Sequence, residues 1–117
     1  MARTESLATM NPRTSERFQQ RIAVEFSALE SSVEGKGMIT DLSKGGCCVE
    51  SDVLPARGTA LRMSLSLPDF TWPMKVERAV VRWVKRTTFG VEFLAMQSSQ
   101  RERLARFIMK LKDEVGY

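Results

Sequence analysis

The stretch "LRMSLSL", residues 61–67, alternates apolar and polar side chains without a break. Successive side chains of a β-strand point to opposite faces of the sheet. A strand here would therefore gather its apolar side chains on one face, namely Leu61, Met63, Leu65 and Leu67. The proline that follows predicts the end of the strand. We therefore expect this chain to build its core from a sheet.

Five further segments carry strand signals on either side of this stretch. Upstream, residues 22–26 alternate in the same way, and the strings "GKGMITDL" and "CCVES" predict a second and a third strand. Downstream, "MKVERAVVRWVKR" and "TFGVEFLAM" predict a fifth and a sixth. Short antiparallel strands in this number favour a closed or nearly closed β-barrel, because closure removes exposed strand edges.

The periodicity changes at Ser98. From there the apolar residues follow the spacing of an amphipathic helix: Leu104, Phe107, Ile108, Leu111 and Val115. Ser99 and Glu102 have the spacing of a capping box. The predicted fold is all-β with one helix, a six-stranded antiparallel β-barrel with a C-terminal α-helix over residues 98–114 that covers an end or a seam of the barrel.

The composition is that of one small domain. The chain has 117 residues, of which 43% are hydrophobic and 27% charged. Residues 1–15 lack periodicity and are predicted to form a flexible N-terminal tail before a barrel domain over residues 16–117. No apolar run approaches the roughly 20 residues of a membrane span, and the polar start lacks a signal-peptide core. We therefore expect a cytoplasmic protein with no membrane insertion.

The sequence lacks the side chains on which most enzymes and metal sites depend. It has no histidine, no Gly-x-Ser-x-Gly elbow and no Gly-x-x-x-x-Gly-Lys loop. Its two cysteines, Cys47 and Cys48, are neighbours and are too few for a structural zinc site. We expect one thiol in the core and the other outside. The prediction is a protein without catalytic activity, cofactor or metal.

Three arginines recur at intervals of four near the start of the chain: Arg13, Arg17 and Arg21. A spacing of four places two side chains on the same side of either a helix or an extended segment. Guanidinium groups bind phosphates bidentately and stack on purine rings. The net charge of +4 also favours an anionic partner. The alternative is a solvated basic tail.

A second polar motif, "DLSKGG" at residues 41–46, lies between two predicted strands. The Asp41 carboxylate can accept hydrogen bonds from the N1–H and the exocyclic amine of guanine, an edge that adenine does not offer. The Ser43 hydroxyl and backbone N–H groups beside Gly45 and Gly46 can bind a phosphate or a base edge, and the glycines permit positive φ or close ligand approach. The alternative is an ordinary turn, in which Asp41 bonds the backbone two residues on.

Together the two motifs resemble the PilZ domain. The matching residues are Arg17 and Arg21, then Asp41, Ser43 and Gly46 about twenty residues later, then Gly90, Val91 and Phe93. The resemblance covers roughly residues 13–115. It implies a six-stranded antiparallel β-barrel with a C-terminal helix that acts as a receptor for the bacterial second messenger cyclic di-GMP.

The resemblance also implies how the ligand is held. Arg17 and Arg21 would contact phosphate and guanine from a segment that folds over the barrel, while Asp41, Ser43 and Gly46 would contact the other side from the barrel surface. Trp83 stands where some family members offer an aromatic ring to a base, or else it only packs. The residue before the first arginine, often basic or bulky in the family, is Glu16, which leaves one ligand or a stacked pair as alternatives.

The predicted function is that of a non-enzymatic cyclic di-GMP receptor and adaptor. Ligand binding would order the N-terminus and change the surface shown to an effector protein. A monomer is expected, with a dimer as the alternative. An adaptor that needs no nucleotide is a second reading, because some relatives lack both motifs. A nucleic-acid-binding barrel is a third, but it needs several exposed aromatics, and the chain has one Tyr and two Trp. No nucleic-acid partner is therefore predicted.

Overall fold

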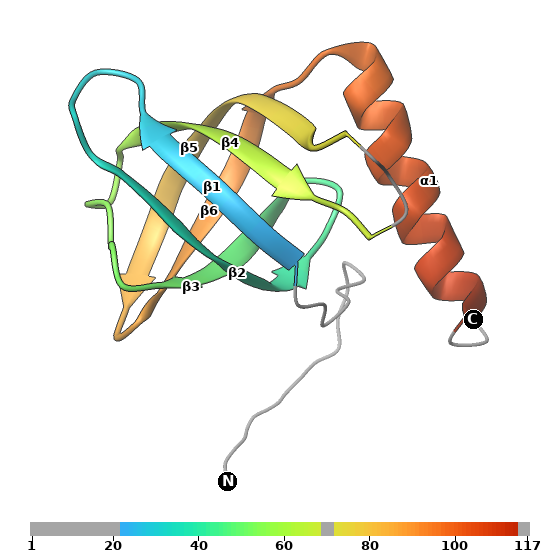
Figure 1. Ribbon diagram of the computed structural model, residues 1–117, viewed down its shortest axis with the longest axis horizontal. Helices are drawn as coiled ribbons and strands as arrows, with labels where there is room; N and C mark the ends of the chain where they lie inside the picture. The colour runs from blue at the N-terminus through green and yellow to red at the C-terminus, as the bar shows by residue number, and fades with distance from the viewer. Residues whose placement is uncertain (1–21, 69–71, 115–117) are drawn as a thin grey trace, which may run out of the picture.

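The computed structural model describes residues 22–68 and 72–114. Six strands precede a single helix (Figure 1). The elements are β1 (Ile22–Ala28), β2 (Glu34–Leu42), β3 (Gly46–Ser51), β4 (Ala60–Ser66), β5 (Met74–Lys85), β6 (Thr88–Ala95) and α1 (Ser98–Glu114). The predicted element types and their order along the chain are confirmed.

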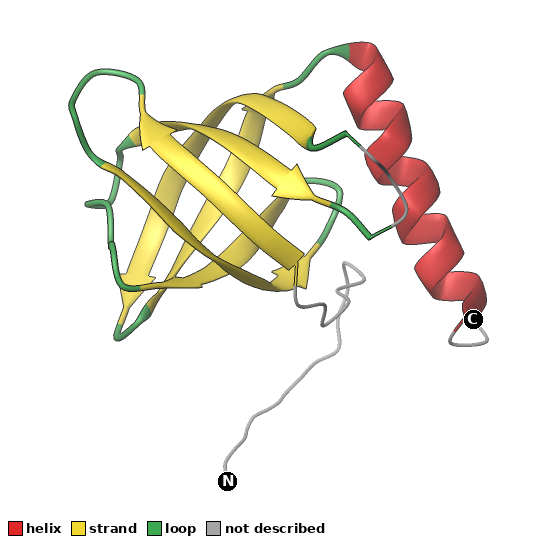
Figure 2. Ribbon diagram, viewed as in Figure 1, coloured by secondary structure: helices red, strands yellow, loops and turns green. Residues whose placement is uncertain are grey.

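The six strands close into one antiparallel barrel in the order β1-β2-β3-β6-β5-β4 (Figure 2). Closure depends on β1, which pairs with β2 on one side and with β4 on the other. Each of the six strands therefore has a hydrogen-bonded neighbour on both sides. The predicted six-stranded antiparallel barrel with a C-terminal helix is confirmed.

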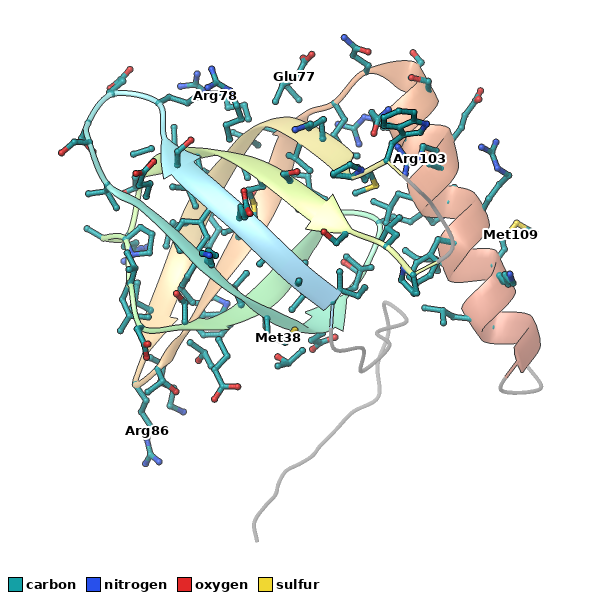
Figure 3. The ribbon with its side chains drawn as sticks, viewed as in Figure 1. Met38, Glu77, Arg78, Arg86, Arg103 and Met109 are labelled. Carbon is teal, nitrogen blue, oxygen red and sulfur yellow. The ribbon has the colours of Figure 1, made fainter. Side chains whose placement is uncertain are left out.

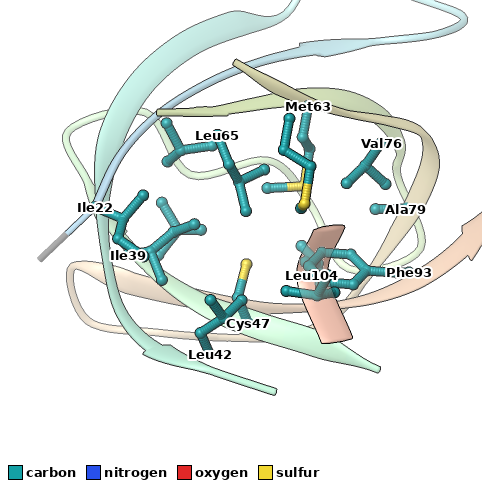
Figure 4. Close-up of a cluster of buried hydrophobic side chains, with 14 of the residues drawn as sticks. Ile22, Ile39, Leu42, Cys47, Met63, Leu65, Val76, Ala79, Phe93 and Leu104 are labelled. Carbon is teal, nitrogen blue, oxygen red and sulfur yellow. The ribbon is translucent and has the colours of Figure 1, made fainter. Parts of the chain in front are cut away.

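The interior of the barrel is filled by the alternating apolar positions. Ile22, Val24 and Phe26 of β1 are buried, as are the apolar residues of the 61–67 stretch. Figure 4 shows core side chains from several strands, among them Ile22, Met63 and Val76, pointing into the barrel. Within this core the rings of Phe26 and Phe89 meet edge to face, with centroids 5.2 Å apart. Each fully buried large aliphatic or aromatic side chain contributes about 1.5–3 kcal/mol to stability.

The helix α1 covers one end of the barrel and packs against β5 (Figure 1). Its buried face carries the described residues of the predicted apolar stripe, namely Leu104, Phe107, Ile108 and Leu111. Arg103 ties the helix to the chain before β5, because its Nη2 donates to the carbonyl of Trp72 at 2.6 Å. Met109 points away from the barrel into solvent (Figure 3). The last stripe residue, Val115, lies outside the described residues.

The capping box predicted at Ser99 is wrong. The first intrahelical hydrogen bond runs from the Arg101 amide to the carbonyl of Gln97, at 3.0 Å. Because the N-cap residue is the one whose carbonyl accepts that bond, the cap is Gln97. Ser99 already lies inside the helix, so the spacing to Glu102 does not mark the helix start.

The N-terminal predictions fall on residues that the structure does not describe. These are the tail over residues 1–15 and the arginines Arg13, Arg17 and Arg21. Within the described ranges, no helix combines the length and the apolar character that crossing a membrane requires.

Candidate functional site

One pocket of about 200 Å³ opens on the outside of the barrel wall where β2, β3, β5 and β6 meet. It contains all five candidate residues that the structure describes, although they come from distant parts of the sequence. Its lining consists of Asp41, Ser43, Gly45, Gly46, Cys47, Cys48, Arg82, Trp83, Gly90, Val91 and Glu92. The fold therefore brings the turn motif and the tryptophan into one site.

A cross-strand row of four residues runs through this pocket. Asp41 of β2 faces Cys48 of β3, Cys48 faces Gly90 of β6, and Gly90 faces Trp83 of β5. Residues that face one another across a ladder project to the same side of the sheet. The neighbouring row, Leu42–Cys47–Val91–Val81, is buried, so the first row lies on the outer face.

Two β-bulges place the ends of this row outside the barrel. Between Ile39 and Asp41 the register shifts by one residue, and the same happens between Val81 and Trp83. In a regular strand Asp41 would share the inward face of Ile39, and Trp83 that of Val81, because each is two positions further on. The extra residue in each bulge reverses the alternation, so the side chains of Asp41 and Trp83 point outward instead of inward. Both side chains consequently reach the pocket.

The turn that joins β2 to β3 is held by Ser43. Its amide donates to the carbonyl of Gly46 at 2.9 Å, and its Oγ donates to the same carbonyl at 3.3 Å. The Gly45 amide donates to the Ser43 Oγ at 3.3 Å. Ser43 thus accepts a hydrogen bond from the amide two residues on, a contact typical of turns. The hexapeptide is both a hairpin corner and a wall of the pocket.

The glycines of the corner serve a purpose other than the predicted backbone freedom. Among the described glycines only Gly58 has a positive φ, so the positive-φ interpretation of Gly45 and Gly46 is wrong. A Cβ on Gly46 would overlap the carbonyl oxygen of Val91 in the adjacent strand, whereas a Cβ on Gly45 would meet open space. Gly46 is therefore required by the close approach of β6, whereas no close contact requires a glycine at position 45.

Trp83 lies over the glycine that it faces. A Cβ on Gly90 would overlap the indole at Nε1, Cε2 and Cζ2. Trp83 is nevertheless 40% exposed, and it lines the pocket. The two alternatives for Trp83 are thus compatible, because part of the ring packs against Gly90 while the residue remains partly exposed.

The two cysteines divide as expected. Both are free thiols, with Cys47 buried and Cys48 half-buried in the pocket lining. Figure 4 shows the Cys47 sulfur pointing into the barrel. Burial raises the pKa of the Cys47 thiol far above its usual value, and the charges of Cys48 and Asp41 raise it further. Cys47 is therefore a protonated core side chain.

One charged pair at this site was not among the residues expected from the sequence. Arg82, the extra residue of the β5 bulge, binds Glu92 of β6, with Nη2 and Nε at 2.7 and 2.8 Å from the same carboxylate oxygen. Both side chains line the pocket. The sequence does contain a signal for this pair, because Arg82 precedes Trp83 and Glu92 follows Val91. An alternating pattern does not predict where a bulge residue such as Arg82 points.

No group of three or more His, Cys, Asp or Glu side chains that could hold a metal ion occurs within the described ranges. The pocket lining provides two carboxylates, a hydroxyl, a guanidinium and an aromatic ring, which are groups suited to an organic ligand. The arrangement can accept hydrogen bonds from a base edge, contact an anion and stack against a planar ring.

The family model described as "PilZ domain" matches residues 11–110. No curated protein sequence matches the chain. Among solved structures, the PilZ domain of CeSA from a cellulose-synthesizing bacterium is 19% identical with a TM-score of 0.66, covering 84% of this chain and 99% of that one. At this identity the likeness establishes the fold.

Two structures of YcgR from Escherichia coli, both with cyclic di-GMP, are also similar. The PilZ domain of YcgR is 15% identical with a TM-score of 0.67, covering 90% of this chain and 95% of that one. A longer YcgR chain is 16% identical with a TM-score of 0.71, covering 88% and 47%. The chain thus spans about half the length of that YcgR structure.

Proposed function

The chain belongs to the PilZ domain family, and from this membership we propose that it is a non-enzymatic receptor for cyclic di-GMP. The observation that carries the proposal is the convergence of Asp41, Ser43, Gly45, Gly46 and Trp83 on one pocket. The fold-level likeness to the two YcgR structures that contain cyclic di-GMP supports the same ligand.

The pocket carries the chemistry that a guanine base requires. Cyclic di-GMP has two guanines, each with an N1–H and an exocyclic amine on one edge. The Asp41 carboxylate accepts from this edge, and the exposed part of the Trp83 indole offers a planar surface for the ring. Adenine lacks that pair of donors, so Asp41 would make the site selective for guanine.

The size of the pocket argues that the barrel surface holds only part of the ligand. Pockets that enclose a drug-sized molecule measure about 300–1,000 Å³, whereas this one measures about 200 Å³. A base fits such a volume, but a whole cyclic dinucleotide needs a second contact surface. We assign that role to the arginine segment that precedes β1.

The charge of the described lining also indicates that the ligand needs a second contact surface. It contains two carboxylates, Asp41 and Glu92, and one guanidinium, Arg82. Cyclic di-GMP carries two phosphates, so binding needs further cations. Arg17 and Arg21, with Arg13 in support, would supply them as charge-assisted hydrogen bonds to phosphate. Holding the ligand between this segment and the barrel would fix the segment in place and alter a surface presented to an effector protein.

Isothermal titration calorimetry with cyclic di-GMP tests the proposal, with GTP and cyclic di-AMP as the comparison ligands. We expect saturable binding of cyclic di-GMP at low ligand concentration, and much weaker binding of the other two. The same titration gives the number of ligands bound per chain. No binding of cyclic di-GMP, or equal binding of cyclic di-AMP, would remove this function.

A further inference from the structure

Arg82 occupies an unusual position at the pocket. It is the extra residue of the β5 bulge, between buried Val81 and pocket-lining Trp83. It has no partner of its own in the β5–β6 register, and its side chain is about half exposed, at 56%. A bulge of this kind re-aims side chains, and here it places a guanidinium beside the tryptophan.

Glu92 fixes the orientation of this guanidinium. Its Oε1 accepts from both Nε and Nη2 of Arg82, at 2.8 and 2.7 Å. An arginine has five N–H donors in a rigid planar fork, and these two contacts use one edge of it. The edge formed by Nη1 and the second hydrogen of Nη2 points away from Glu92, so the pair presents a preset donor edge.

The charges around the pocket make this edge important for an anionic ligand. Among the described residues that line it, Arg82 is the only cation, and Asp41 and Glu92 are both acidic. Without Arg82, the barrel side of the site would present two carboxylates to any phosphate. Cations outside the described part of the chain would then have to overcome this repulsion as well as bind the ligand.

We propose that Arg82, held in place by Glu92, is a phosphate-binding residue on the barrel side of this site, and that Glu92 is its positioning residue. This inference rests on the proposed function and adds to it a contact that belongs to neither of the two motifs. The barrel side of the site then contributes a cation of its own, next in sequence to Trp83, the proposed base-stacking residue.

The test is a calorimetric titration with cyclic di-GMP of the wild-type chain, Arg82→Ala, Arg82→Lys and a control. Arg62→Ala is the matched control, because Arg62 is also an exposed strand arginine but lies on β4, outside this pocket. We expect Arg82→Ala to weaken binding about tenfold or more, as loss of a charge-assisted contact does. Arg82→Lys should recover part of the loss, and Arg62→Ala should bind like the wild type.

The double variant Arg82→Ala/Glu92→Gln separates a direct contact from simple charge balance. If Arg82 binds phosphate, the double variant stays weak, because removing the carboxylate does not restore the contact. If it binds like the wild type, Arg82 only neutralises Glu92, and the proposal is overturned. Equal affinities of Arg82→Ala and wild type would overturn it as well. Failure of the proposed function looks different, since the wild-type chain itself would then not bind.

Thermal unfolding of each variant shows whether it is folded. The pair is half exposed on both sides, so we expect only small changes in melting temperature. Should Arg82→Ala fail to fold, Arg82→Gln keeps a polar but shorter side chain and removes its charge, and it is subject to the same criteria.

Discussion

Asp41 and Trp83 lie at the two ends of one cross-strand row, and each directly follows the extra residue of a β-bulge. Both stand two positions beyond a fully buried residue, Ile39 and Val81 respectively. The same local irregularity, on two strands that are not neighbours, turns both side chains out of the core. The carboxylate and the ring of the candidate site therefore share one structural origin.

The arginine segment is the first target for mutation. If Arg21 binds the ligand as proposed, Arg21→Ala removes a charge-assisted contact worth about 1.5–3 kcal/mol in total, so we expect cyclic di-GMP binding to weaken roughly 10- to 150-fold. Calorimetry measures the change. Arg57→Ala, an exposed arginine in the loop between β3 and β4, is the control and should bind normally. Unchanged affinity in Arg21→Ala would exclude this arginine from the site.

Asp41→Asn tests the reading of guanine. Asparagine keeps the shape of the side chain but replaces one acceptor with a donor, which opposes the N1–H and amine edge. We expect cyclic di-GMP to bind roughly 10- to 150-fold more weakly, while the weak binding of cyclic di-AMP changes little. Asp52→Asn is the control, because Asp52 is an exposed aspartate that does not line the pocket containing Asp41. A variant that keeps its full preference for guanine would contradict the assignment.

Gly90→Ala tests the packing of Trp83 on the sheet. The added Cβ would overlap the indole, so we expect the variant to lose about 1–3 kcal/mol of unfolding free energy through overpacking. Urea denaturation of Gly90→Ala, Trp83→Ala and the double variant measures the coupling. With the indole removed, the alanine should cost little. Losses that simply add in the double variant would show that the two residues do not press on each other.

The Cys47 thiol is expected to make the unfolding free energy depend on pH in alkaline solution. Its pKa is raised by burial above the ordinary value of 9.0. Above that pH the unfolded chain loses the thiol proton while the folded chain keeps it. The unfolding free energy should therefore fall as pH rises beyond 9.0, by up to about 1.4 kcal/mol per pH unit. Below 9.0 both states are protonated, and the thiol makes no pH-dependent contribution.

Urea denaturation across this pH range, in reducing buffer, measures how steeply the unfolding free energy falls with pH. Lysines and the tyrosine also titrate there, so the informative quantity is the difference between the wild type and Cys47→Ala. We expect the variant to show a shallower alkaline loss, whatever its stability at neutral pH. Cys48→Ala, on the pocket side, is the control. Identical slopes for wild type and Cys47→Ala would mean that this thiol ionises in the folded protein as well.

Most of the fold could be predicted because alternation and burial agree along these strands. The regular apolar positions of β1 and β4 all lie in the core. The helix register is also visible in the sequence, since its apolar residues have one spacing and pack against one partner. Barrel closure follows from the need to pair every edge, which is a general property of short antiparallel strands.

The irregular positions could not be predicted from the same patterns. A bulge adds one residue without a sequence signature of its own, so the direction of Trp83 and the presence of Arg82 at the pocket depended on the register of two strands. Gly46 is needed because a neighbouring strand comes close, and local composition does not record such contacts. The helix cap at Gln97 depended on where the chain leaves β6.

Because the row from Asp41 to Trp83 crosses four hydrogen-bonded strands, its width is set by three inter-strand spacings of about 4.8 Å each, or at most roughly 14 Å. Those spacings belong to the barrel itself and cannot change without breaking ladder hydrogen bonds. The distance across the row from Asp41 to Trp83 is therefore fixed by the barrel. The Asp41 and Trp83 backbones are held at a fixed separation, to which a ligand that contacts both residues has to conform.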